Sequence, residues 1–314
     1  MRQKEYNRSC KENFLFFRWF MLEFKKIELS DVPLLRPYFE KCTNRFCDFS
    51  VGGSVMWRNV YETEFAVSDG ALYMRFRLSD GKWAFSYPLG AAFGDTVKNL
   101  LEYCEKADEK LIFAAVSEEE KKEMELLFPY ACAFADRDHA DYIYLGEDLA
   151  GFKGKKYATQ RNHINRFLSE NPDWHFEMIR KEDIPAVNAY FAKYAALSAK
   201  DSFSALEERK CVLDVFENFD AYGFFGEALY VGTDIVGFFL CEAVADTLMV
   251  HIEKCDRSVT GAYQMLVKRE AEKYCTGKLI YVNREDDAGD EGLRRSKLAY
   301  RPLYLAEKYT VTIE

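Results

Sequence analysis

The pattern of apolar and polar positions predicts a meander of short strands in the first half of the chain, followed by alternating helices and strands. Alternating apolar residues indicate three strands separated by Ser-Asp-Gly turns, at Glu64–Val67, Leu72–Leu78 and Trp83–Tyr87. The pattern then predicts a helix at Gly94–Lys106, a strand at Leu111–Val116, an acid-capped helix at Ser117–Leu127 and a strand at Asp141–Leu145.

The second half repeats this order. Its predicted strands are Ala228–Val231, Ile235–Glu242 and Leu248–Ile252, followed by a helix at Ser258–Tyr274, a strand at Lys278–Val282, a short basic helix and a strand at Tyr304–Ile313. The segments before the strands also match. DVPLLRPYFEK (Asp31 to Lys41) and DIPAVNAYFAK (Asp183 to Lys193) share Asp, Pro, Tyr, Phe and Lys. These matches indicate an internal duplication.

The repeated order of helix, three strands, helix, strand, helix, strand is typical of the GNAT acyltransferase fold. We therefore expect an α+β or α/β protein with two tandem GNAT-like domains, each a mixed sheet flanked by helices. The expected segments are an N-terminal extension at 1–20, a first domain at 21–150, a basic bridging segment at 151–176 and a second domain at 177–314. Two unrelated α+β lobes are the alternative. We also hypothesise that Met21 is the natural start.

Composition narrows the class of protein. Of 314 residues, 49% are hydrophobic and 30% charged, the balance of a soluble globular protein, and the net charge of −9 argues against DNA binding. Nine scattered cysteines and four histidines show no spacing typical of a metal site or a disulfide framework, so we expect no metal and a cytoplasmic location. The apolar stretch Phe14–Phe24 is too short to span a membrane.

Candidate catalytic residues lie where the third strand of the second half meets its helix. His251 and Glu253 alternate with apolar residues, so we expect both on one face of the strand, where either can act as a general base. GNAT enzymes carry Arg/Gln-x-x-Gly-x-Gly/Ala at this junction to bind coenzyme A. The chain matches this pattern in part, with Arg257, Thr260, Gly261 and Ala262. Alternatively, Gly261 simply permits close packing of the helix.

The bridging segment contains a run of cations, and its periodicity predicts a helix from Thr159 to Leu168. Ile164, Phe167 and Leu168 should face inward. Arg161 and Asn162 are candidate donors to a phosphate or carboxylate, and a solvated helix surface is the alternative.

Near the C-terminus, YVNREDDAGDEGLRRSKLAYRP (Tyr281 to Pro302) holds many charges of both signs. Helix capping by Asp290 and pairs at i,i+4 spacing explain some of them. The rest follow the carboxyl end of a strand, where open α/β sheets bind ligands, or belong to the next helix. They are our candidate substrate-binding residues: Asn283, Arg284, Glu285, Asp286, Arg294 and Lys297. A solvated turn is the alternative.

Three segments together resemble a known bacterial family. Asn283–Pro302, Lys155–Phe167 and Val250–Leu266 are similar to proteins grouped with the C-terminal domain of phosphatidylglycerol lysyltransferase. The resemblance implies a duplicated GNAT-like fold, shared with the Fem peptidyltransferases. The lysyltransferases move an amino acid from aminoacyl-tRNA to a lipid headgroup, but they also carry a multi-helix membrane domain. This sequence shows no such domain, so the lipid acceptor is not carried over.

The expected activity is therefore acyl or aminoacyl transfer in the second lobe to an amine or hydroxyl acceptor. The candidate donors are an acyl-coenzyme A and an aminoacyl-tRNA, so tRNA stays open as a partner. Arg284, Arg294 and Lys297 would hold an anionic group, while Glu285 and Asp286 would receive an ammonium. A non-catalytic module that binds or senses a small ligand is the alternative.

Overall fold

The computed structural model describes residues 22–197 and 203–313. The expected extension at 1–20 and the proposed start at Met21 lie outside the described residues. Within the described part of the chain, no helix is long and apolar enough to cross a membrane.

The first sheet has seven strands, in the order β1-β2-β3-β4-β5-β14-β6. These strands are β1 (Lys25–Lys26), β2 (Glu64–Ser68), β3 (Ala71–Arg77), β4 (Trp83–Phe85), β5 (Leu111–Val116), β14 (Tyr309–Ile313) and β6 (Cys132–Ala135). Helices α3 (Phe93–Ala107) and α4 (Glu118–Leu127) bury Leu100 and Met124 against this sheet. A capping box between Ser117 and Glu120 starts α4 as the sequence predicts.

The second sheet also has seven strands, in the order β13-β7-β12-β11-β10-β9-β8. They are β13 (Tyr304–Ala306), β7 (Asp141–Leu145), β12 (Tyr281–Asn283), β11 (Thr247–Cys255), β10 (Asp234–Val244), β9 (Phe225–Val231) and β8 (Trp174–Met178).

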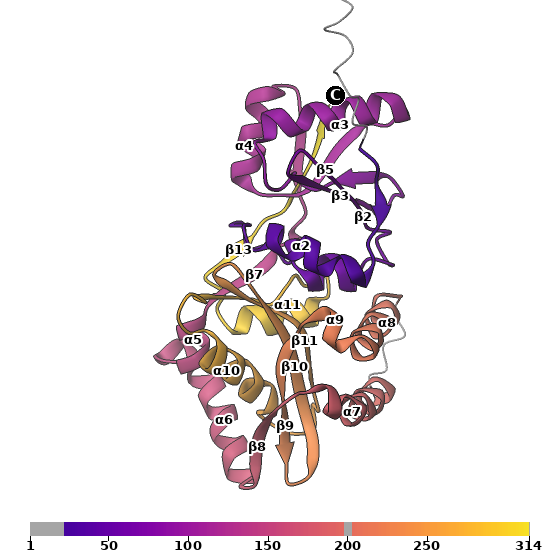
Figure 1. Cartoon of the computed structure of the whole chain (residues 1–314). Helices are drawn as coiled ribbons and strands as arrows, with labels where there is room; N and C mark the ends of the chain where they lie inside the picture. Colours follow the sequence, from indigo (N-terminus) through magenta and orange to yellow (C-terminus); the bar gives the residue numbers. More distant parts are fainter. Residues whose placement is uncertain (1–21, 198–202, 314) are drawn as a thin grey trace, which may run out of the picture.

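Helices cover both faces of the second sheet (Figure 1). One face carries α5 (Gly146–Gly151), α6 (Ala158–Glu170) and α10 (Ala262–Tyr274). The other carries α7 (Ile184–Leu197), α8 (Phe203–Glu217) and α9 (Phe219–Tyr222), and it also meets α2 (Val32–Phe39) and the π-helical turn Val51–Met56 of the first lobe. Helix α11 (Glu291–Ala299) connects β12 to β13. The core on the second face is therefore shared by both lobes.

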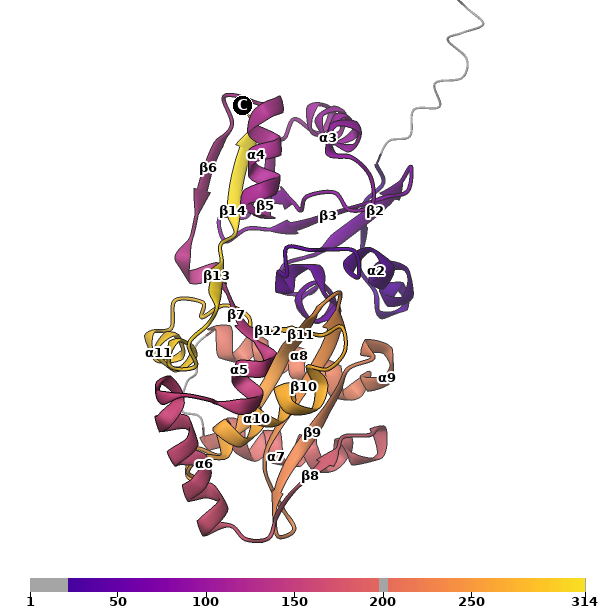
Figure 2. The ribbon, with the colours of Figure 1, turned by 90° about the vertical axis from the view of Figure 1, so that its left-hand side faces the viewer.

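Both sheets follow one plan, and the predicted tandem GNAT-like fold is confirmed. In each, antiparallel strands lead to a parallel pair, β4 with β5 or β11 with β12, joined through a helix. Beyond that pair, each sheet receives a strand from the other half of the chain: β14 lies between β5 and β6, and β7 between β12 and β13 (Figure 2). The lobes thus exchange one strand each.

This exchange departs from the expected ranges 21–150 and 177–314, because β7 belongs to the second sheet and β14 to the first. The predicted single strand Tyr304–Ile313 is wrong for the same reason. It is two strands, β13 and β14, which pair in different sheets. Whether either range folds on its own stays a prediction.

Several other elements differ from expectation in detail. Helix α10 begins at Ala262 with Gly261 as its N-cap, rather than at Ser258. The bridging helix is confirmed as α6, with Ile164 and Phe167 buried, but Leu168 is 37% exposed instead of facing inward. Strands β6 and β8 were not predicted. Both are short edge strands without a clean apolar alternation, so periodicity gave no signal for them.

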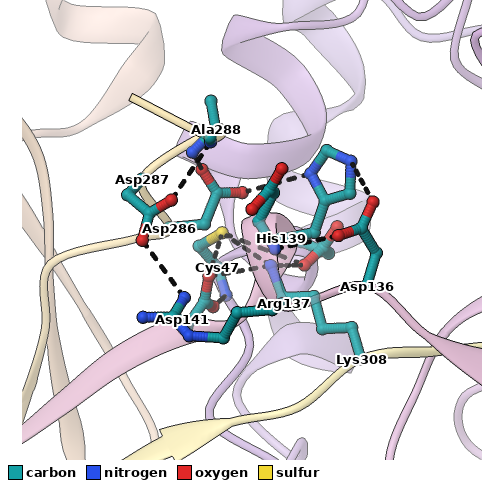
Figure 3. Close-up of polar contacts among 12 residues, drawn as sticks. Cys47, Asp136, Arg137, His139, Asp141, Asp286, Asp287, Ala288 and Lys308 are labelled. Carbon is teal, nitrogen blue, oxygen red and sulfur yellow. Dashed lines mark hydrogen bonds and ion pairs between the residues drawn. The ribbon is translucent and has the colours of Figure 1, made fainter. Parts of the chain in front are cut away.

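The two exchanged strands meet at a buried ion pair. Asp141 begins β7 and Lys308 immediately precedes β14, and the Lys308 Nζ lies 2.8 Å from the Asp141 Oδ1. Cys47 and Asp48 complete this group, which we call the crossing cluster (Figure 3). Because Asp141 begins β7 and Lys308 immediately precedes β14, their pairing holds one crossing segment against the other.

Candidate functional site

The parallel strands β11 and β12 separate at the candidate site. They pair only at Thr247↔Tyr281, Leu248↔Val282 and Met249↔Asn283. Strand β11 continues to Cys255, whereas the chain leaves the sheet after Asn283, and Glu285 adopts a φ of 56°. This divergence lies at the carboxyl end of β12, where the sequence predicted a ligand.

A β-bulge decides which side chains face each side of the divergence. Leu240 and Cys241 of β10 are opposite Ile252 and Val250 of β11, so His251 is an extra residue in β11. The bulge interrupts the alternation of side chains. His251 therefore faces the first lobe, and Glu253 faces α10. The prediction that His251 and Glu253 share one face is wrong, because a strict period of two holds only without a bulge.

On the first-lobe face, His251 lies between two carboxylates, and we call Glu242, His251 and Glu285 the His251 cluster. The Nε2 of His251 is 2.9 Å from the Glu242 Oε1, and its Nδ1 is 2.8 Å from the Glu285 Oε1. Burial alone would lower the pKa of the imidazole, but the two carboxylates outweigh it and raise the pKa to about 9. The ring is therefore an imidazolium at neutral pH, and both N–H groups are engaged.

The first lobe completes the partners of Glu242. The backbone N–H of Gly52 donates to the Glu242 Oε1 at 2.8 Å, and the Nη1 of Arg36 donates to its Oε2 at 3.2 Å. A Cβ on Gly52 would lie 2.2 Å from the His251 ring, so only glycine fits there. The His251 cluster thus joins the two lobes. Since its imidazolium has no free lone pair to accept a proton, this geometry does not favour the expected role of His251 as a general base, and the same expectation for Glu253 stays a prediction.

On the opposite face, Glu253, Glu270 and Arg284 form what we call the Arg284 cluster. The Nη2 of Arg284 donates to the Glu253 Oε2 across the divergence, and its Nε is 3.9 Å from the Glu270 Oε1. The three side chains are 8–10% exposed or fully buried. The guanidinium also lies 4.9 Å from the ring centre of Tyr300 and 6.0 Å from that of Tyr144.

Several buried polar atoms of the Arg284 cluster have no hydrogen-bond partner among residues 22–197 and 203–313. They are the Oε1 of Glu253, both carboxylate oxygens of Glu270, and the Nε and Nη1 of Arg284. Buried polar groups are nearly always hydrogen-bonded, so this group calls for an explanation. Burial, reinforced by Glu253, raises the pKa of the Glu270 carboxyl well above its ordinary value.

The other charged residues after β12 hold the loop in place. The Nζ of Lys297 donates to the carbonyls of Arg284, at 2.6 Å, and Asp286, and burial lowers the pKa of this lysine. Arg294 pairs with both carboxylate oxygens of Asp287, with its Nε 3.0 Å and its Nη2 2.7 Å away. Asn283 is buried and donates to the Asp141 Oδ2 at 2.8 Å. These contacts give the three residues a structural reason.

The acids at the ends of this loop also have partners. Asp286 lies beside His139 (Figure 3), with 3.8 Å between its Oδ2 and the histidine Nδ1. Asp290 caps α11 as predicted, accepting from the backbone N–H of Leu293. Of the predicted residues after β12, only Arg284 has buried polar atoms without a partner in the described part of the chain.

The candidate anion-binding residues of the bridge and of α10 also have local explanations. Arg161 donates from Nη1 to the carbonyls of Phe152, at 2.5 Å, and Gly154, at 2.6 Å. Gly261 has a φ of 85°, and a Cβ there would lie 2.2 Å from the backbone oxygen of His163 in α6. The packing explanation for Gly261 therefore accounts for its conformation. Asn162 and Arg257 are exposed, Thr260 is half-buried, and Ala262 is buried at the start of α10.

Sequence reasoning missed Glu242 and Glu270, the buried acids of the two clusters. A signal for both was present. Glu270 follows Ala262 and Leu266 at i,i+4 spacing on the buried face of α10, and Glu242 follows Phe238 and Leu240 in alternation on β10. An acid in an apolar pattern marks a buried charge that must have a partner or a function.

The crossing cluster also has the composition of a metal site. One ligand atom each from Cys47, Asp48 and Asp141 lie within 4.8 Å of one another. Lys308 supplies a cation at this place, with its Nζ 2.6 Å from the Asp48 Oδ2 and 3.4 Å from the Cys47 Sγ. Burial raises the pKa of the Cys47 thiol well above its usual range, and Asp141 adds to the effect. The contacts of Lys308 therefore explain this cluster without a metal ion.

Comparison with solved structures identifies close and distant relatives of this fold. A conserved protein of unknown function from Bacteroides thetaiotaomicron is 34% identical, with 94% of this chain and all of that chain covered and a TM-score of 0.88. L-PGS from Bacillus licheniformis is 15% identical, with 80% of this chain and 83% of that chain covered and a TM-score of 0.56. At this identity the second likeness shows the fold alone.

Sequence comparison also identifies relatives of this chain. An uncharacterized protein of Mycoplasmoides gallisepticum, MYCGA3080, is 22% identical over 175 residues, so the match spans 55% of this chain and only 56% of that protein. The family model described as "Phosphatidylglycerol lysyltransferase, C-terminal" matches residues 40–312, which include both lobes and both clusters. The chain therefore belongs to the family of the phosphatidylglycerol lysyltransferase C-terminal domain.

Proposed function

We propose that the protein is an acyl- or aminoacyltransferase whose reacting centre is the Arg284 cluster. The observation that carries this proposal is the set of buried, unpartnered atoms of Glu253, Glu270 and Arg284 at the divergence of β11 and β12. A ligand with a carbonyl oxygen and an amino group supplies partners for both kinds of atom. The family supports the same class of reaction, because its name describes the transfer of a lysyl group.

The chemistry assigns one role to each side chain. The acceptor's nitrogen or oxygen attacks the activated carbonyl carbon, and Glu253 takes the acceptor's proton on its free Oε1. The Nε–H and Nη1–H of Arg284 stabilise the oxyanion that forms on the carbonyl oxygen. The bond to the leaving group then breaks, and Glu253 returns the proton to the departing oxygen or sulfur. The new bond is an amide or an ester.

Glu270 favours an aminoacyl donor. The carboxylate oxygens of Glu270 are buried beside Glu253 without a hydrogen-bond partner among the described residues, and burial raises the pKa of this carboxyl. An ammonium group would supply both a hydrogen-bond donor and the opposite charge that offsets the cost of burial. The packing of α6 against Gly261 also disfavours coenzyme A as the donor. The backbone of His163 lies where a phosphate of coenzyme A would approach the first turn of α10. We therefore propose an aminoacyl ester rather than a coenzyme A thioester as donor.

Thermal unfolding in the presence of donors tests this function. Lysyl-tRNA should raise the melting temperature of the wild-type protein, and acetyl-coenzyme A should not. Glu270→Gln should lose the shift. Glu227→Gln is the matched control, because Glu227 is equally buried in the same lobe but is paired with Arg269 and Lys273. If neither a panel of aminoacyl-tRNAs nor coenzyme A thioesters changes the melting temperature, the transferase proposal fails.

The locked His251 favours a second candidate, a non-catalytic module that binds an amino acid. With one of the two expected bases engaged on both nitrogens, fewer groups are left for proton transfer. Free lysine, added in the same experiment, should then stabilise the protein as much as lysyl-tRNA does. Movement of labelled lysine from lysyl-tRNA into a new amide or ester with an added amine or hydroxyl acceptor, absent in Glu253→Gln, would instead establish the transferase.

A further inference from the structure

Strand β6 forms an edge of the first sheet that is unlike the other sheet edges. Within the described residues it pairs only with β14, and all four of its residues are exposed. It ends a run of ten uncharged residues, Leu126–Ala135, in a chain that is 30% charged. Leu126 is 83% exposed, Tyr130 85% and Phe134 62%. A free strand edge next to exposed apolar side chains is a template for pairing with another strand.

The other edges carry the usual protection against such pairing. Strand β1 consists of two lysines, and β8 includes His175 and Glu177. Strand β13 is three residues long and ends in the buried Ala306. Charges and short length are the means by which natural sheets prevent edge-to-edge contact. Strand β6 is also short, with four residues, but it has no charged side chain, so its edge lacks the protection that charges give.

We infer that two copies of the chain associate through β6, which pairs antiparallel with itself about a two-fold axis and joins the two seven-stranded sheets into one. The open side of β6 presents backbone N–H and C=O groups, with which a further strand can pair. The uncharged β6 suits a second copy as the partner. The net charge of −9 opposes the association of two copies, and pairing through β6 brings no like charges of this strand together across the axis.

The side chains on β6 suit this arrangement. Phe134 and Cys132 are opposite Thr310 and Thr312 of β14, so they lie on the face of the sheet that buries Ile112 and Ala114. A two-fold axis perpendicular to the sheet keeps that face continuous and brings the two Phe134 rings together. Aromatic cross-strand pairs of this kind are among the more stabilising contacts between strands.

Sedimentation equilibrium in reducing buffer tests the pairing without interference from a disulfide through the exposed Cys132. The wild-type protein should sediment as a dimer of the 36.6 kDa chain. Phe134→Lys and Phe134→Glu should each weaken dimerisation by at least about 100-fold, because like charges then meet at the axis. An equimolar mixture of the two variants should restore a dimer. Met178→Lys on β8, where Met178 is 52% exposed, is the control and should stay dimeric.

A monomeric wild-type protein at about 50 μM would overturn the inference, since a dimer with a dissociation constant of about 10 μM or below is mostly assembled at that concentration. So would a Phe134→Lys variant that dimerises like the wild type, or a mixture of the two charged variants that stays monomeric. Hydrogen exchange of the wild type gives an independent check. The amides of residues 132–135 should exchange at least about tenfold more slowly in concentrated than in dilute samples.

Discussion

The His251 cluster and the Arg284 cluster lie on opposite faces of the same diverging strands and contain the same groups, two glutamates and one cation. In the His251 cluster each ring nitrogen has a carboxylate partner, and Gly52 and Arg36 complete Glu242. In the Arg284 cluster five buried atoms have no partner among the described residues. This difference in hydrogen bonding distinguishes the His251 cluster, which connects the two lobes, from the Arg284 cluster, which we propose binds a ligand. Residue type alone does not distinguish them.

The largest expected effect on stability comes from removing the imidazole of the His251 cluster. His251→Ala leaves Glu242 buried and without its main partner, so we expect a loss of about 3–5 kcal/mol in the free energy of unfolding. Urea denaturation measures this loss. A change below about 1 kcal/mol would mean that the cluster does not hold the lobes together, and the comparison would break.

The pH dependence of stability should carry the signature of the same histidine. Its pKa is raised by folding, from about 6.5 to about 9, so its stabilising contribution is complete below pH 6.5 and is lost as the pH rises through 9. The loss amounts to about 3 kcal/mol. Urea denaturation of the wild type between pH 6 and 10 should show this decline, and His251→Gln should decline less. Parallel curves for both proteins would contradict a raised histidine pKa.

A smaller loss in the free energy of unfolding is expected from a change at Gly52, the first-lobe residue that contacts the His251 cluster. In Gly52→Ala the added methyl group meets the His251 ring, and the local shift that follows should cost about 2 kcal/mol. Gly94→Ala is the control, because a Cβ at Gly94 meets no atom within 4 Å. Thermal unfolding of the two variants should differ clearly, and equal melting temperatures would mean that the histidine ring moves aside without cost.

The smallest effect on stability is expected for Glu270→Gln in the Arg284 cluster. This variant also distinguishes most clearly between the two clusters. Glu270→Gln replaces a buried carboxyl that has no hydrogen-bond partner within residues 22–197 and 203–313, so the free energy of unfolding should stay within about 1 kcal/mol of the wild type or increase. Urea denaturation of the ligand-free protein measures it. A loss as large as that of His251→Ala would show that the two clusters have the same structural role.

Much of the fold follows from the sequence because its signals are local. The alternation in Leu72–Leu78 and the capping residues Ser117 and Glu120 give β3 and α4 nearly to the residue. The exchange of β7 and β14 does not follow, since a strand's own pattern says that it is buried but not in which sheet. DYIYL and YTVTI are adequate strands for either lobe.

The site was predictable in position but not in detail. The loop after β12 was expected from its charges, and Arg284 is central to it. The bulge at His251 depends on pairing with β10, which no local pattern encodes, and it reversed the expected side of His251 relative to Glu253. Lys297 and Arg294 looked like binding residues because the sequence does not show that backbone carbonyls and Asp287 already engage them.

The exchange of strands also affects the order in which the two lobes can fold during synthesis on the ribosome. Strand β6 is joined to the rest of the first sheet only through β14, the last strand of the described chain, which lies between β5 and β6. The lobe that is synthesised first is therefore the lobe that is finished last, against the usual sequence in which N-terminal domains fold before the rest. During synthesis, β5 and β6 cannot take their final places side by side with β14 until the end of the described chain has been made.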